Sequence, residues 1–268
     1  MPELKGLYSI AAGQAFADQL AAGLLRRLGG DTASLAAVTV LLPTRRACIA
    51  LRDAFLRVSA GQALILPRLM PLGDLEDAEA ELAVAPASWS AATDGAEPQA
   101  VMAPLRRQLL LTRLILHWAG QPAASAGQGL QVTTDQAVHL AAALGRLQDQ
   151  IETEGLTFDR LADLVPERYA AHWQDTLKFL AILTEHWPKL EAEMRAVSAA
   201  KQRRGVTLAQ ADAWLSNPPN DPVVVAGSTG SVPATAALIA SVAAMPKGVV
   251  VLPCLLYTSD AADERVRV

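Results

Sequence analysis

Short apolar runs bounded by glycine, proline or polar residues restrict the fold of this chain more than any other feature of its sequence. Five runs have the length and the continuous apolar character of fully buried parallel strands. They are residues 7–10 (LYSI), 38–42 (VTVLL), 63–66 (ALIL), 223–226 (VVVA) and 249–252 (VVVL). We predict that four of them, all except 63–66, lie in one parallel sheet.

Helical patterns separate the first two of these runs and also the last two. One face of the first helix is apolar, and a Gly-Gly pair at 29–30 is expected to end it. That face consists of Phe16, Leu20, Leu24 and Leu25. Strands that alternate with helices at both ends of the chain predict an α/β fold, in which crossover helices cover a parallel sheet.

The middle of the chain, residues 102–215, shows helical periodicity and no strand pattern. Two apolar faces stand out, and Pro166 and Pro188 are expected to begin and to interrupt the second helix. The faces are Leu140, Leu144, Leu147 and Ile151, and then Trp173, Leu177, Leu180 and Trp187. We therefore predict four segments before residue 254: the first part of an α/β domain (1–85), a linker (86–101), a helical insertion (102–216) and a return to the sheet (217–253).

Composition limits the classes of partner and the compartment. Hydrophobic residues make up 51% and charged residues 19% of the chain, as in folded globular proteins. The net charge of −4 gives no general attraction for nucleic acid, so such a partner would need a local basic surface. The uncharged stretch 222–246 is broken by Ser, Thr, Gly and Pro, which predicts strand, turn and helix rather than a membrane span. We expect a cytoplasmic protein.

Residues 38–56 (VTVLLPTRRACIALRDAFL) form the most informative motif. They are similar to motif Ia of superfamily 1 helicases, in which a strand, Pro-Thr and a helix follow one another. Thr44 is placed to cap the helix, and Arg45 and Arg46 are expected to be exposed in its first turn. A helix N terminus with guanidinium groups suits a DNA phosphate, although a capped surface helix with solvated arginines explains the same residues.

Longer segments resemble the AddB-type double-strand break repair proteins of alphaproteobacteria. They are 172–190 (HWQDTLKFLAILTEHWPKL), 223–253 (which contains AGSTGSVPAT), 66–75 (LPRLMPLGDL) and 104–115 (PLRRQLLLTRLI). This resemblance implies a RecA-like sheet similar to domain 1A of superfamily 1 helicases, with an all-helical insertion similar to domain 1B. It also implies a DNA-binding subunit that acts with an AddA-type helicase–nuclease on single- and double-stranded DNA ends, during end resection for homologous recombination.

The nucleotide-binding motifs of an active helicase are missing. After the first strand the chain reads AAGQAFADQLAAG, which keeps Gly13 but has no Lys or following Ser/Thr to hold phosphate, and Asp18 would repel it. The strand 223–226 ends at Gly227 where an acidic pair would hold magnesium. We predict a degenerate nucleotide site at Gly13 and Gly227, with no ATPase activity and no cofactor in this chain. The turn 227–231 is expected to be a tight turn.

Residues 254–268 (CLLYTSDAADERVRV) resemble a translated transposase sequencing adapter more than a native continuation. We expect a non-native tail on an N-terminal fragment. The resemblance to AddB then implies that the iron–sulfur cluster and the nuclease metal belong to a C-terminal region that this chain lacks.

Three other functions remain open on sequence alone. The chain could be an active ATP-dependent helicase domain, which the missing Lys disfavours. It could be a nucleotide-binding α/β enzyme built around residues 223–231, but no ribose-binding carboxylate follows at the expected distance. It could also be an interaction module whose helical insertion binds another protein.

Overall fold

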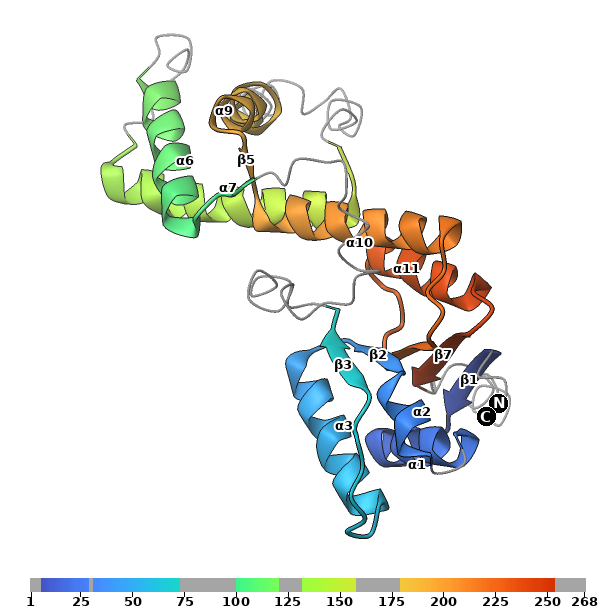
Figure 1. The fold of residues 1–268 in the computed structure, drawn as a ribbon. Helices are drawn as coiled ribbons and strands as arrows, with labels where there is room; N and C mark the ends of the chain where they lie inside the picture. Colours follow the sequence, from blue (N-terminus) through green and yellow to red (C-terminus); the bar gives the residue numbers. More distant parts are fainter. Residues whose placement is uncertain (1–5, 29–30, 73–99, 121–131, 158–178, 254–268) are drawn as a thin grey trace, which may run out of the picture. The chain divides into compact units, whose positions relative to one another are not determined.

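The computed structural model describes residues 6–28, 31–72, 100–120, 132–157 and 179–253 (Figure 1). Its internal contacts divide the chain into two compact units. Unit 1 consists of Met1–Asp94 and Val206–Val268, and unit 2 is Gly95–Gly205. Unit 2 therefore interrupts unit 1 in sequence.

Unit 1 contains a five-stranded sheet in the order β1-β7-β6-β2-β3, in which all neighbouring strands are parallel. The strands are β1 (Gly6–Ile10), β2 (Thr39–Leu42), β3 (Arg68–Pro71), β6 (Val223–Ala226) and β7 (Gly248–Pro253). The helices are α1 (Phe16–Arg27), α2 (Thr32–Ala36), α3 (Arg45–Val58), α11 (Pro233–Ala244) and the second half of α10 (Ala199–Ser216).

Alternate residues of the central strands enter two different cores. Val40, Leu42 and Val224 pack with α1 and α3 on one face of the sheet. Leu41 and Val225 pack on the other face, with α11 and with Ala211 and Trp214 of α10. Because β2 and β6 are buried along their whole length, both faces need apolar side chains, which explains why these strands are continuous apolar runs.

The direction of the chain across the sheet reverses between β2 and β6. From β2 the chain passes through α3 to its outer neighbour β3, whereas from β6 it passes through α11 to β7 on the opposite side. Since right-handed crossovers in opposite directions place their helices on opposite faces, α3 and α11 cover different sides of the sheet (Figure 1). The boundary between β2 and β6 is therefore a topological switch point.

The prediction of one parallel sheet from four apolar runs is confirmed, and so is the strand, turn and helix in 222–246. The prediction of a strand at 63–66 is wrong. The strand is β3, which begins after Pro67 and is aligned on β2 by the amide of Arg68, which donates to the Val38 carbonyl (2.9 Å). Pro67 has no amide hydrogen to contribute to a ladder, so the apolar run before it packs as an irregular segment instead.

Unit 2 contains α6 (Pro104–Ala119), α7 (Thr134–Glu154), a π-helical turn (Ile182–His186), α9 (Trp187–Met194) and the first half of α10. Its core includes Leu111 and Ile115 of α6, Leu144 of α7, and Trp187. A capping box formed by Thr133 and Gln136 begins α7, and Gly155 ends it in the left-handed conformation. Both ends of α7 are therefore specified by local sequence.

The prediction that residues 102–215 lack strands holds for most of the described part of that range, but not at Ala196–Val197. This segment, β5, pairs in parallel with β4 (Ala100–Val101). A strand of two residues is too short to give a periodic signal in the sequence. The expected helix start at Pro166 and the apolar positions Trp173 and Leu177 lie outside the described residues, as does most of the expected linker.

Phe55 and Leu56 provide a matched test of the core of unit 1, because they are neighbours on α3. Phe55 is fully buried, whereas Leu56 is 65% exposed. We expect Phe55→Ala to lower the free energy of unfolding by about 3–5 kcal/mol and Leu56→Ala by less than about 1 kcal/mol. Urea denaturation of both variants would measure this, and equal losses would contradict the assignment of Phe55 to the core.

Candidate functional site

The N terminus of α3 lies at the carboxyl end of β2, at the switch point of the sheet. Thr44 has extended backbone angles (φ −145°, ψ 161°), and its Oγ1 accepts a hydrogen bond from the Ala47 amide at 3.2 Å. The predicted cap is therefore present. The first turn of α3 contains no acidic residue, so the positive end of the helix dipole is not neutralised by its own helix.

The two arginines of this turn differ in their surroundings. Arg46 is exposed, as predicted. Arg45 is only partly exposed and its Nε atom is buried, so the expectation that both side chains are exposed is wrong for Arg45. Arg46 is therefore the more exposed of the two guanidinium groups in this turn.

The turn after β6 contacts the start of α1 and the residue that precedes the cap of α3. Gly227 has a φ of +75°, and a β-carbon built on it would lie 3.3 Å from the Phe16 ring and 3.6 Å from Cδ of Pro43. Phe16 is the first residue of α1, and Pro43 directly precedes Thr44. The structure therefore brings together the start of α1, the start of α3 and the glycine turn of β6.

Gly13 lies apart from this contact. It has a φ of +79°, it is exposed, and a β-carbon on it would meet no heavy atom within 4 Å. The turn around it is closed by the Gln14 amide, which donates to the Ala11 carbonyl at 3.3 Å. Gly13 and Gly227 follow β1 and β6, which are separated in the sheet by β7. The two predicted positions of the degenerate site thus share an edge without direct contact.

Phe16 is the residue that sequence reasoning missed at this edge. It packs partly buried against the core of unit 1, with its ring beside the α-carbon of Gly227. The signal was present in the sequence, because an aromatic residue begins the helix that follows the Gly13 turn. The ring fills space beside Gly227, whereas a β-carbon on Gly13 would meet no heavy atom within 4 Å.

The other charged group that we singled out near this helix is already paired. The carboxylate of Asp18 on α1 accepts a hydrogen bond from the guanidinium of Arg57 on α3 at 2.5 Å, and both side chains are partly exposed. Arg57 neutralises Asp18, so the repulsion of a phosphate that we expected from Asp18 is weakened. The two side chains form an ion pair between α1 and α3.

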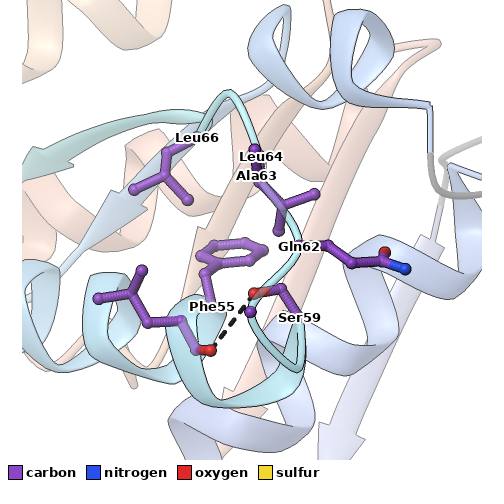
Figure 2. A pocket seen from close by; sticks show the side chains of 8 residues that line it. Phe55, Ser59, Gln62, Ala63, Leu64 and Leu66 are labelled. Atoms are coloured by element: carbon purple, nitrogen blue, oxygen red, sulfur yellow. Dashed lines mark hydrogen bonds between the residues drawn. The ribbon is translucent and has the colours of Figure 1, made fainter.

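A cavity of about 370 Å³ lies at the other end of α3, away from Thr44 (Figure 2). Its walls are largely apolar, and Figure 2 shows the Phe55 ring below Leu66 and Leu64, with Ser59 beneath the ring and Gln62 to its right. The Ser59 hydroxyl donates to the Leu56 carbonyl at 3.3 Å. The residues that line this cavity include no pair of acidic, basic or nucleophilic side chains that could act in catalysis. We therefore interpret it as an imperfectly packed region of the core.

Within the described residues, no group of three or more His, Cys, Asp or Glu side chains is arranged to hold a metal ion. None of the described helices combines the length and apolar composition needed to cross a membrane. No protein-family model matches the chain, and no curated protein is similar to it in sequence.

Gly227 and Gly13 allow the contact with Phe16 to be tested against a matched control. Both glycines have positive φ, so Ala at either position should cost roughly 1–2 kcal/mol from backbone strain. Only Gly227→Ala also crowds Phe16, and we expect it to cost about 1–3 kcal/mol more. Urea denaturation measures both.

Replacing Phe16 with Leu in the Gly227→Ala protein should recover the additional loss of unfolding free energy, because the smaller side chain leaves room for the new methyl group. The same replacement in the Gly13→Ala protein should recover nothing. Equal effects of Phe16→Leu in the two backgrounds would show that the Phe16 ring is not what excludes a side chain at Gly227.

Proposed function

We propose that the carboxyl edge of unit 1, between β2 and β6, binds the sugar-phosphate backbone of a nucleic-acid strand and does not hydrolyse nucleotide. One observation carries the proposal: the N terminus of α3, capped by Thr44 and followed by the exposed Arg46, lies at the switch point of the sheet. Ligands of open α/β sheets bind in the crevice at this point. A helix N terminus with a guanidinium group favours a phosphate.

The surroundings of the helix end favour a strand of nucleic acid over a mononucleotide. A mononucleotide needs a loop that encloses its phosphates and a Lys that neutralises them. Here the turn after β1 has neither, and the Phe16 ring takes up the space beside Gly227. A polymer backbone can instead cross an open edge and use one phosphate at a time.

The resemblance of the chain to AddB-type proteins supports a broader proposal. In it, unit 1 is a RecA-like domain of superfamily 1 type, and unit 2 is its helical insertion. The chain is then a catalytically inactive, cytoplasmic part of a subunit that handles single- and double-stranded DNA ends with an AddA-type helicase–nuclease. Thr44, Arg45 and Arg46 would contact the strand, and Arg46 is the more exposed of the two arginines.

Arg46→Ala tests the proposed phosphate contact, and Arg52→Ala is its control on the same helix. Both side chains are exposed, but Arg52 lies almost two turns further from the sheet edge. We expect Arg46→Ala to weaken the binding of single-stranded DNA and to reduce the slope of log K against log salt by about 0.7.

Arg52→Ala should leave that slope unchanged, and neither variant should change the melting temperature, because both residues are exposed. Fluorescence anisotropy across a salt series gives the slopes. Equal losses in the two variants would point to a diffuse basic surface instead of a contact at the helix end.

The glycine turn after β6 supplies one observation for the competing function of small-nucleotide binding. Gly227 and Gly230 both have positive φ, a geometry that also occurs in phosphate-binding turns. Isothermal titration with Mg-ATP separates the two functions. We expect no binding at micromolar nucleotide, and micromolar affinity would overturn the proposal that the edge serves a polymer.

A further inference from the structure

The strand β3 lies at one end of the sheet in unit 1. Among the strands that the structure describes, it has a single neighbour, β2. A strand in this position presents backbone N–H and C=O groups on its outer side, where a strand of another protein molecule can pair with them. The segment 66–71 (LPRLMP), which includes β3, contains Pro67 and Pro71. The effect of these prolines on the edge depends on the side of β3 that each one faces.

The hydrogen bonds to β2 establish which residues of β3 face inward. The Arg68 amide donates to the Val38 carbonyl at 2.9 Å, and the Leu72 amide donates to the Leu42 carbonyl at 2.7 Å. The two strands are paired in continuous register between these bonds. Because the amides of a strand alternate between its two sides, the even-numbered residues direct their N–H groups toward β2. The odd-numbered residues of this segment therefore face the outer edge.

Both prolines occupy outward-facing positions. A proline nitrogen carries no hydrogen, so Leu69 is the one outward-facing residue of the segment 67–71 that has an amide hydrogen. A further strand laid along β3 would find a carbonyl at each outward position but a donor only at Leu69. The carbonyl groups of that strand opposite Pro67 and Pro71 would leave water without gaining a hydrogen bond, which is unfavourable.

The side chains of β3 explain why its backbone needs this protection. Leu69 and Met70 pack against the two cores on opposite faces of the sheet, so β3 keeps apolar side chains on both faces. An apolar edge strand favours pairing with another chain. Its short length of four residues and the exposed side chain of Arg68 act against pairing, and the two prolines add to their effect.

We propose that Pro67 and Pro71 close the outer edge of β3, so that a second copy of this chain cannot pair with it and extend the sheet. The prolines act at both ends of the edge and leave Leu69 as the single donor between them. This protection is independent of the proposed nucleic-acid contact, because it concerns a backbone edge and not the N terminus of α3.

Pro71→Thr tests the proposal, because threonine supplies an amide hydrogen and is favoured in strands. Pro71 is a better position for the test than Pro67, which is buried. Pro218→Thr is the matched control, since Pro218 is exposed between α10 and β6. We expect the average mass of the Pro71→Thr chain to rise about twofold over that of the unmodified chain between about 1 and about 100 µM, as a dimer forms. Pro218→Thr should follow the unmodified chain, and sedimentation velocity measures all three.

Hydrogen exchange followed by NMR locates the contact. In the unmodified chain, the Leu69 amide should exchange at least about tenfold faster than the amides of Arg68 and Leu72, which are bonded to β2. In the associated Pro71→Thr chain, the Leu69 amide should become protected, because it donates to the added strand.

An average mass of Pro71→Thr equal to that of the unmodified chain over the whole range would overturn the proposal, and so would equal association of Pro218→Thr. Association that leaves the Leu69 amide unprotected would also overturn it, since the contact then lies elsewhere. Should Pro71→Thr not fold, exchange in the unmodified chain decides the question. Fast exchange at Leu69 supports a closed edge, and exchange as slow as at Arg68 shows that the edge is already paired.

Discussion

The pairing of β2 with β6 is the contact on which the rest of unit 1 depends. It joins Thr39–Leu41 to Val223–Val225, which the whole of unit 2 separates in sequence. Because the chain leaves these two strands in opposite directions, their carboxyl ends form the switch point, and α3 and α11 are assigned to opposite faces. The cap of Thr44, the exposure of Arg46 and the turn at Gly227 all derive their position from this one pairing.

The same edge of the sheet supplies the backbone amides on which the proposed function depends. In parallel sheets of this kind the N termini of the crossover helices lie at one edge, so every such sheet has free backbone amides there. What a given sheet can hold depends on the side chains added to it. Here the additions are an aromatic ring at Phe16, a glycine at the end of β6 and an exposed guanidinium at Arg46, and our proposal of an open, anionic chain over an enclosed triphosphate rests on them.

Sequence patterns predicted the central strands well, because a strand buried on both faces must be apolar at every position, as in Val223–Ala226. They failed at the edge of the sheet, where β3 is only partly buried and its register depends on β2. At the site, the cap of Thr44 is a local property and was predictable. The partial burial of Arg45 and the contact of Phe16 with Gly227 depend on segments brought together by folding, which no local pattern encodes.

The interrupted arrangement of unit 1 also has a consequence for how the protein is made. On a ribosome, β6 emerges about 180 residues after β2, a delay of roughly 10–40 seconds at ordinary rates of translation. During that time the edge of β2 that pairs with β6 has no partner, and Val40 and Leu41 lack their neighbours Val224 and Val225. Unit 2 has local helical contacts and can fold in this interval. Nascent unit 1 instead presents an uncovered strand edge, the kind of surface that chaperones bind and that favours aggregation when synthesis is crowded.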